Sequence, residues 1–189
     1  MKRLSICVDI DGTITDPFYW VDDVNQYFNK SIKPEEITTY NIPKAHNISD
    51  EAFLEYYMEH GAKMHLSAKI REGAAYYLQE LHNVHDIYYV TARMSHMNEV
   101  TEVWFNKYSV PFKEIYYLGS HDKLNKAQEL NCDIFIEDRL ENALQLSEAG
   151  IEVYLVDCPY NQLELNDKII RVNTWEDIYN EVNKRFREW

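Results

Sequence analysis

Short apolar segments alternate with stretches of helical periodicity along most of this chain. After residue 70 the apolar segments cover residues 87–90, 115–118, 134–136, 153–156 and 169–172, and another covers residues 4–10. Apolar runs of this length are typical of strands that are buried on both faces of a sheet. Strands that alternate with helices favour a parallel sheet with helices on both sides. The sequence therefore predicts an α/β fold with a doubly wound, Rossmann-like parallel sheet of about five to six strands.

Helices are expected at residues 70–83, 95–108, 123–130, 141–149 and 175–187. Ser95 and Thr174 precede or begin two of these stretches, and serine and threonine are favoured N-cap residues. Gly150 follows another stretch, at the position where glycine most often ends a helix. The first four of these stretches lie between successive strands, where a parallel sheet requires crossover connections.

Residues 16–69 differ, because they show helical patterns but no strand pattern. The patterns cover residues 21–28, 50–60 and, more weakly, 35–40, with Pro34 and Pro43 as breakers and Ser49 as a cap. We therefore expect residues 1–15 and 70–189 to form a core. Residues 16–69 are expected to form a small helical cap, inserted after the first strand. Closure of such a cap over a site excludes water.

Two carboxylates, Asp9 and Asp11, end the first apolar segment, and a glycine turn follows them. They share one face at the period of a strand, at the sheet edge where ligands bind in open α/β folds. Such a pair can hold a divalent cation while one of its oxygens attacks phosphorus. A calcium loop is the alternative, but Thr13, Ile14 and Pro17 interrupt the acid spacing that this loop requires.

Three later segments carry polar side chains that suit the same chemistry. Thr91 ends the apolar run at 87–90, Lys123 opens a helical stretch, and Glu137 and Asp138 end the run at 134–136. Each alone has a simpler interpretation: a helix-capping hydroxyl, a solvated lysine, and acids at a helix N-terminus. Their order, each at a strand end or a helix start, favours one shared site.

These four segments together resemble the motifs of the haloacid dehalogenase-like hydrolases, a superfamily that uses an aspartyl nucleophile and Mg²⁺. The helical insert, the motif spacing and residues 149–161 further resemble the 5′(3′)-deoxyribonucleotidase family and its bacterial nucleotidases. Two departures stand out. Members of that family often carry paired aspartates where this chain has Glu137 and Asp138, and Ser-Pro where it has Ala92 and Arg93.

The resemblance implies Mg²⁺ as the cofactor. Asp9 is expected to be the nucleophile, and Asp11 the general acid and base, with its main-chain carbonyl also binding the metal. Asp138 is expected to bind the metal directly and Glu137 through water. The expected metal ligands are therefore Asp9, Asp11, Glu137 and Asp138, and the expected catalytic residues are Asp9, Asp11, Thr91 and Lys123.

Substrate contacts are expected from both parts of the chain. Thr91 and Lys123 would hold the phosphoryl oxygens, with Arg93 as a further cation and Lys126 as the alternative lysine. Phe18, Tyr19 and Trp20 follow the catalytic turn and could stack a base or line the cap; packing between cap and core is the alternative use of these aromatic rings.

The expected function is a Mg²⁺-dependent phosphomonoesterase of nucleoside monophosphates, with 5′(3′)-deoxyribonucleotides among them. Two alternatives stay open: a phosphatase or phosphotransferase acting on another small metabolite, such as a sugar phosphate, and a non-catalytic binding module. A homodimer is also left open.

The formal charge of −13 argues against nucleic acid as a partner, because phosphates attract basic surfaces. No stretch approaches the roughly 20 apolar residues that cross a bilayer, and no signal-peptide pattern opens the sequence, so we expect no membrane partner and a cytoplasmic location. Three scattered cysteines, Cys7, Cys132 and Cys158, are expected to be buried free thiols.

Overall fold

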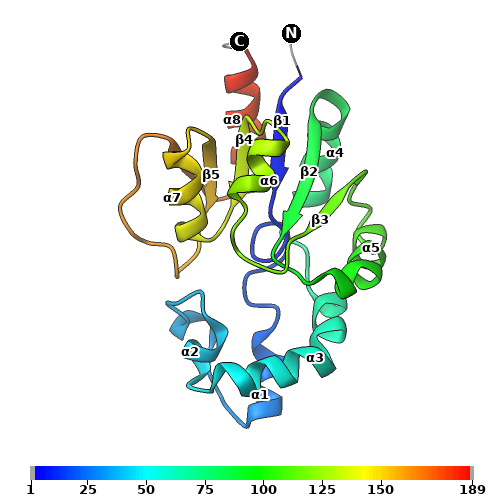
Figure 1. The fold of residues 1–189 in the computed structure, drawn as a ribbon, viewed down its shortest axis with the longest axis vertical. Helices are drawn as coiled ribbons and strands as arrows, with labels where there is room; N and C mark the ends of the chain where they lie inside the picture. The colour runs from blue at the N-terminus through cyan, green and yellow to red at the C-terminus, as the bar shows by residue number, and fades with distance from the viewer. Residues whose placement is uncertain (1–2, 188–189) are drawn as a thin grey trace.

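The computed structural model describes residues 3–187 and contains a six-stranded sheet in which all strands are parallel (Figure 1). The strands, which lie in the order β3-β2-β1-β4-β5-β6, are β1 (Ser5–Val8), β2 (Asp86–Thr91), β3 (Ile115–Tyr117), β4 (Ile134–Glu137), β5 (Glu152–Val156) and β6 (Ile169–Val172). The helices are α1 (Val21–Phe28), α2 (Ile42–His46), α3 (Asp50–Ser67), α4 (Ala74–Val84), α5 (Asn98–Lys107), α6 (Leu124–Glu129), α7 (Leu140–Glu148) and α8 (Trp175–Arg187). The predicted doubly wound α/β fold is confirmed.

Helices cover both faces of the sheet. On one face α4, α5 and α8 pack through apolar side chains that include Leu78, Trp104 and Trp175. On the other face α6 and α7 pack through Ala127 and Leu146. Successive side chains of β1 enter the two clusters in turn, which explains why this strand is apolar at every position that faces the interior.

The strand order reverses direction between β1 and β4. Chain connections lead from β1 outward to β2 and β3, then return to β4 on the other side of β1 and continue to β5 and β6. At such a switch point the loops that follow the two central strands separate and leave a crevice at the carboxyl edge. Asp9 follows β1 and Glu137 ends β4, so both lie at this crevice.

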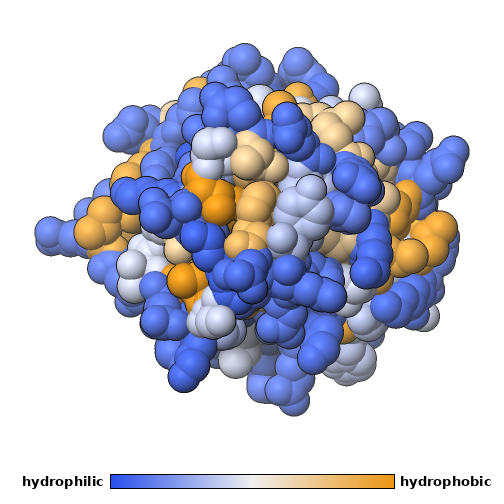
Figure 2. Space-filling view, turned by 90° about the horizontal axis from the view of Figure 1, so that it is seen from below, coloured by the Kyte–Doolittle hydropathy of each residue, from blue (hydrophilic) through white to orange (hydrophobic). Residues whose placement is uncertain are grey.

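Helices α1, α2 and α3 lie beyond the carboxyl edge of the sheet, away from both ends of the chain (Figure 1). They enclose an apolar cluster of their own, which includes Trp20, Val24, Tyr56 and Met64. Seen from this side, the surface is mostly hydrophilic, with apolar patches among the polar side chains (Figure 2). A separate cluster of this kind suits the predicted cap, and the division at residues 16–69 stays a prediction.

Two segments, one before and one after the helical group, connect it to the rest of the chain and pair with each other. Thr15 and Ile70 form an antiparallel bridge. The main-chain N–H of Asp16 donates to the carbonyl of Lys69 (2.8 Å), and the N–H of Arg71 donates to the carbonyl of Ile14 (2.8 Å). The chain therefore leaves and re-enters the core through one paired site.

Several helix boundaries differ from the prediction. The helix expected to end at residue 60 runs to Ser67, because Gly61 continues it and lets Met97 approach closely. Ser95 is not the cap of α5, since a 3₁₀ turn over Ser95–Met97 precedes that helix. Helix α4 begins only at Ala74, after Gly73 with a φ of 75°.

The weak pattern at 35–40 gives only a 3₁₀ turn over Pro34–Glu36, after which the chain is extended. The buried Ile37 then joins the apolar cluster of the helical group, and this packing outweighs a weak helical preference. The caps at Ser49 and Thr174 are confirmed, since their hydroxyls accept from the N–H groups of Ala52 and Asp177 (3.1 Å each).

Two further expectations concern the described residues. Within residues 3–187 no helix has the length and apolar character to cross a membrane. The three cysteines are buried and free, as expected.

Asn161 joins the loops that follow β4 and β5. Its side-chain N–H groups donate to the carbonyls of Asp138 (2.7 Å) and Val156 (2.8 Å). Its side-chain oxygen accepts from the N–H of Cys158 (3.2 Å) and from Arg171 (2.7 Å). Asn161, Asp138, Val156 and Cys158 are all buried, so removal of this amide leaves three main-chain groups without these partners and without water. Arg171 is partly exposed and also binds Asp157 (2.8 Å).

We expect Asn161→Ala to lower the free energy of unfolding by about 2–4 kcal/mol, because it leaves several buried polar groups without partners. Urea unfolding measures this change. The matched control is Gln162→Ala, at the exposed neighbour, which should cost less than about 1 kcal/mol. Equal stability of the two variants would show that the loops are held by other contacts.

Candidate active site

Three buried carboxylates meet where β1 and β4 end. They belong to Asp9, Glu137 and Asp138, which are at most 4% exposed, and one oxygen from each lies within 4.8 Å of the others. They meet because β1 and β4 pair in register, with Val8 opposite Ile136. The structure thus brings together three of the four expected metal ligands.

Lys123 supplies the positive charge within this acid cluster. Its ammonium group donates to Asp9 and to Glu137, the latter at 2.8 Å, and the side chain is almost fully buried. Burial alone would lower the pKa of Lys123, but these two carboxylates raise it, so the group stays charged. The helix expected at 123–130 begins one residue later, so Lys123 stands immediately before α6.

The acid cluster carries more negative charge than Lys123 offsets. Three carboxylates against one ammonium leave an excess of two negative charges when all four groups are ionised. Burial, and then the charge of Glu137, raise the pKa of Asp138 to about 7, and the same causes raise the pKa of Asp9. Buried carboxylate oxygens with this excess fit a divalent, oxygen-preferring cation in both charge and ligand type.

Asp11 lies outside the acid cluster and is held by a different set of groups. Arg93 grips both its oxygens, Nε to Oδ2 at 2.8 Å and Nη2 to Oδ1 at 2.6 Å, and the Tyr19 hydroxyl donates to Oδ1 at 2.8 Å. Although burial opposes it, Arg93 and then His65 hold the pKa of Asp11 well below its usual range. The guanidinium expected on the phosphoryl group is thus committed to Asp11, with its remaining nitrogen on Thr101 (2.9 Å).

The other expected residues take different positions. Thr91 ends β2, and its buried hydroxyl accepts from the N–H of Arg93 (3.1 Å). Trp20 lines the cavity described below while its ring packs on His46, at 5.3 Å between centroids. The ring of Phe18 packs edge-on against Tyr160, at 6.2 Å between centroids.

A cavity of about 820 Å³ separates the sheet edge from the helical group. Asp11, Arg93 and Asp138 line it from the sheet side. Trp20 and Tyr57 line it from the helical group. This volume lies within the range of small-molecule and cofactor sites, and the mixture of apolar walls with a few polar groups is typical of them.

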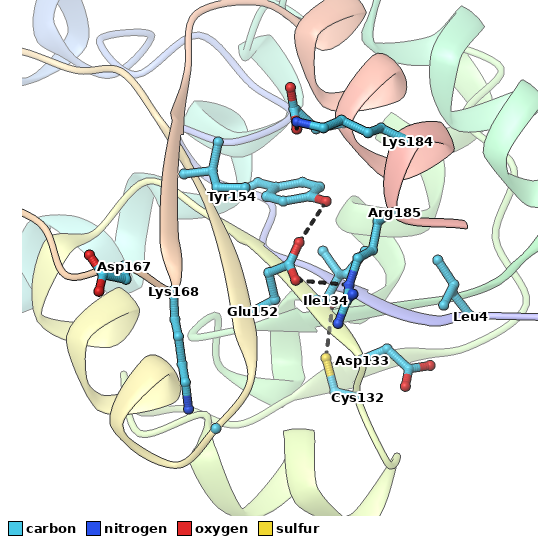
Figure 3. Close-up of a pocket in the computed structure, with 13 residues that line it drawn as sticks. Leu4, Cys132, Asp133, Ile134, Glu152, Tyr154, Asp167, Lys168, Lys184 and Arg185 are labelled. Carbon is cyan, nitrogen blue, oxygen red and sulfur yellow. Dashed lines mark hydrogen bonds and ion pairs between the residues drawn. The ribbon is translucent and has the colours of Figure 1, made fainter. Parts of the chain in front are cut away.

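A second hollow, of about 470 Å³, lies at the amino edge of the sheet (Figure 3). Its charged side chains pair with one another: Glu152 accepts from Tyr154 (3.0 Å) and binds Arg185 (3.0 Å), and Lys184 approaches Glu181 (3.5 Å). None of the expected catalytic or metal-binding residues lines this hollow, so the cavity at the carboxyl edge is the candidate active site.

Comparison with known proteins identifies the family of this chain. A family model described as 5′ nucleotidase, deoxy (Pyrimidine), cytosolic type C protein matches residues 3–187. The chain belongs to this family. A nucleotidase of Clostridium acetobutylicum is 40% identical over 188 residues, which cover 100% of this chain and 98% of the relative. A 5′(3′)-deoxyribonucleotidase of Bacillus subtilis is 26% identical over 185 residues, or 94% and 97% of the two chains.

Solved structures agree on the fold. A haloacid dehalogenase-like hydrolase from Streptococcus pneumoniae matches with a TM-score of 0.72 at 18% identity, over 97% of this chain and 98% of its own. The fold and the nucleotidase family that the sequence resembles are thus confirmed. So is the enzyme class: this member of the nucleotidase family is a hydrolase of phosphoric monoesters.

Two tyrosines near the acid cluster were not expected in the site. Tyr160 donates to the Asp138 carboxylate. The ring of Tyr40 lies between the guanidinium of Arg139 (4.9 Å) and the rings of His121 (5.4 Å) and Tyr160 (5.6 Å). Burial, and then the charge of Asp138, raise the pKa of Tyr40, which places its hydroxyl within the influence of the acids. The sequence offered one indication, since the residues 156–161 already resembled this nucleotidase family.

Both the backbone conformation at position 12 and the nearby side chain of Asp138 require a glycine there. Its φ is +86°, which favours glycine, and a Cβ at this position would lie 2.2 Å from Asp138 Oδ2. We therefore expect Gly12→Ala to displace that carboxylate and to lower the rate of phosphate release by roughly 10²-fold.

The matched control for this change is Gly119→Ala. Gly119 also has a positive φ, +64°, but a Cβ there meets no atom within 4 Å. It tests backbone strain without the collision, and we expect it to retain most of the activity. Equal losses in both variants would attribute the effect to strain alone.

Proposed function

We propose that this protein is a Mg²⁺-dependent phosphomonoesterase that hydrolyses nucleoside monophosphates through an aspartyl phosphate on Asp9. The observation that carries this proposal is the acid cluster of Asp9, Glu137 and Asp138, closed by Lys123 at the ends of β1 and β4. Membership of a nucleotidase family supports the substrate class.

Asp9 and Asp138 would hold the metal directly, with Glu137 acting directly or through water and Asp11 offering its main-chain carbonyl. Bound Mg²⁺ would offset the charge of the cluster and of the phosphoryl oxygens. Lys123 would bind a phosphoryl oxygen and keep the Asp9 carboxylate ionised and directed at phosphorus. Thr91, at the end of the neighbouring strand β2, would donate its hydroxyl to another phosphoryl oxygen.

Hydrolysis would take two displacements. In the first, an Asp9 oxygen forms a bond to phosphorus while the bond to the ester oxygen breaks, and Asp11 gives a proton to the departing oxygen. In the second, Asp11 takes a proton from water, whose oxygen displaces Asp9 and releases inorganic phosphate. The pairing with Arg93 keeps Asp11 ionised in the described form, which suits the base of the second step, and the proton that Asp11 takes from water there is the one that it gives in the first step of the next turnover.

The helical group of residues 16–69 would act as a cap that encloses the leaving group. Trp20, Phe53 and Tyr57 line the cavity from this side and present ring faces or edges of the kind that bind a nucleobase. A sugar phosphate would use the same acid cluster but would leave these rings without a partner. A purely binding role does not require the buried pair of Asp9 and Lys123.

We expect phosphate release from 5′- and 3′-nucleoside monophosphates, including their deoxy forms, in Mg²⁺ and its loss in EDTA, because the acid cluster has an excess of negative charge. The measurement compares these esters with glucose 6-phosphate and other sugar phosphates at equal concentration. Faster release from sugar phosphates would contradict nucleotides as the substrate class and leave the proposed mechanism on Asp9 unchanged. The absence of metal-dependent release from every ester would contradict the proposal as a whole.

Asp9→Asn should lower turnover by at least about 10⁴-fold, because an amide is a poor nucleophile. The fold should remain, since the amide fills the same space and removes one of three repelling charges; circular dichroism and thermal unfolding check this. The control is Asp167→Asn, an exposed carboxylate at the amino edge, which should retain wild-type turnover. Near-normal turnover of Asp9→Asn would exclude Asp9 as the nucleophile.

A further inference from the structure

A row of hydrogen-bonded side chains runs from helix α3 to Asp11. The Tyr57 hydroxyl lies 2.8 Å from His65 Nε2, and His65 Nδ1 lies 2.9 Å from the Tyr19 hydroxyl. That hydroxyl lies 2.8 Å from Asp11 Oδ1. Tyr57 and His65 belong to α3, Tyr19 precedes α1, and Asp11 follows β1. The row therefore crosses from the helical group to the core.

The direction of each hydrogen bond follows from Asp11. An ionised carboxylate only accepts, so the Tyr19 hydroxyl donates to it. The Tyr19 oxygen is then free to accept from the N–H at His65 Nδ1, which leaves Nε2 as the acceptor for Tyr57. Burial and the charge of Arg93 lower the pKa of His65, which agrees with a neutral ring that has one donor and one acceptor. In every hydrogen bond of the row, the donor is therefore the group farther from Asp11 and the acceptor is the group nearer to it.

The row is buried at its centre and uses both nitrogens of its histidine. His65 is 3% exposed, and each of its ring nitrogens has a tyrosine hydroxyl as partner. His46, also buried in the helical group, has no partner for either nitrogen. The contrast shows that burial in this group does not by itself provide a histidine with two partners.

Asp11 is therefore held from two sides. Arg93 grips it from the core, and Tyr19, ordered by His65, grips it from the helical group. A carboxylate that transfers a proton must point at the leaving oxygen, and small displacements cost large factors in rate. Tyr19 also packs against the apolar cluster of the core, and because His65 belongs to α3, the bond between His65 and Tyr19 requires that helix to lie against the core.

We propose that Tyr19 and His65 are positioning residues that orient the Asp11 carboxylate, so that protonation of the leaving group depends on docking of the helical group. This inference rests on the proposed function. It makes the helical group part of the acid–base machinery, in addition to a cover that excludes water.

The chemistry of the leaving group supplies a selective test. A nucleoside or sugar hydroxyl leaves phosphorus as a strongly basic alkoxide unless it is protonated, whereas p-nitrophenolate leaves readily without a proton. A residue that acts through Asp11 in the first step therefore matters for alkyl esters and matters little for p-nitrophenyl phosphate. A residue that only stabilises the fold affects both esters alike.

Tyr19→Phe removes the hydroxyl and keeps the ring. The experiment measures kcat and KM in Mg²⁺ for thymidine 5′-monophosphate, glucose 6-phosphate and p-nitrophenyl phosphate. For the alkyl ester that the wild type hydrolyses faster, we expect kcat/KM, which reports the steps up to release of the leaving group, to fall by roughly 10 to 100-fold. For p-nitrophenyl phosphate kcat/KM should stay within about threefold, because the second step, in which Asp11 is the base for every ester, does not enter this ratio. Tyr56→Phe, at a tyrosine of α3 outside the row, is the control and should change neither rate.

A second pair of variants guards against misfolding of Tyr19→Phe. His65→Asn retains a side-chain amide near the position of Nδ1 and can still donate to Tyr19, whereas His65→Gln places its amide near Nε2. We expect His65→Gln to lower kcat/KM for the alkyl ester selectively and His65→Asn to recover part of it.

The outcomes separate this inference from the proposed function. Equal losses of kcat/KM for alkyl and aryl esters, or unchanged kcat/KM for the alkyl ester in Tyr19→Phe and His65→Gln, overturn the positioning role and leave the proposed function intact. Wild-type protein that releases phosphate from none of the three esters overturns the proposed function, and this inference with it.

Discussion

Three buried carboxylates that share one ammonium group set the main constraint on this structure. Leaving a buried charge without a partner costs roughly 3–5 kcal/mol, so Asp9, Glu137 and Asp138 cannot be held together by their own interactions. The backbone holds them: β1 pairs with β4, and the N–H of Asp9 extends that pairing to the carbonyl of Ile136 (3.0 Å). Lys123 then offsets part of the charge. The apolar core stabilises the pairing of the strands. This pairing thus maintains an unfavourable arrangement of charges at the carboxyl edge of the sheet, where the candidate active site lies.

Much of this arrangement could be predicted from the sequence, because it follows from strand ends. Apolar runs locate buried strands, and parallel strands bring their carboxyl ends to one edge, so acids that directly follow two runs meet if the strands are neighbours. Asp9 and the pair Glu137 and Asp138 satisfy this condition. Lys123 was placed by its position at a helix start, which the structure also shows. These predictions need only chain order and the period of a strand.

The surroundings of Asp11 could not be predicted in this way. Arg93 lies 82 residues from Asp11, and His65 reaches it through Tyr19 from a helix outside the sheet. Periodicity determines which face of one helix is apolar, but it does not determine how a group of helices docks on a sheet edge. The continuation of α3 beyond residue 60 was also not predicted, because glycine has a low helix preference, yet Gly61 lies within the helix and close to Met97.

The charges of the site explain why this negatively charged protein would need a bound cation to bind a phosphate ester. Lys123 is already paired with two carboxylates, and Arg93 is paired with Asp11, so the two buried cations nearest the acids do not present a net positive site. With a formal charge of −13 the chain adds no long-range attraction for an anion. A divalent cation held by the acid cluster would reverse the local sign of the potential. Exclusion of water by the helical group would then strengthen that attraction, because Coulomb energies grow as the local dielectric constant falls. Binding of metal and docking of the helical group are therefore expected to favour each other in the presence of substrate.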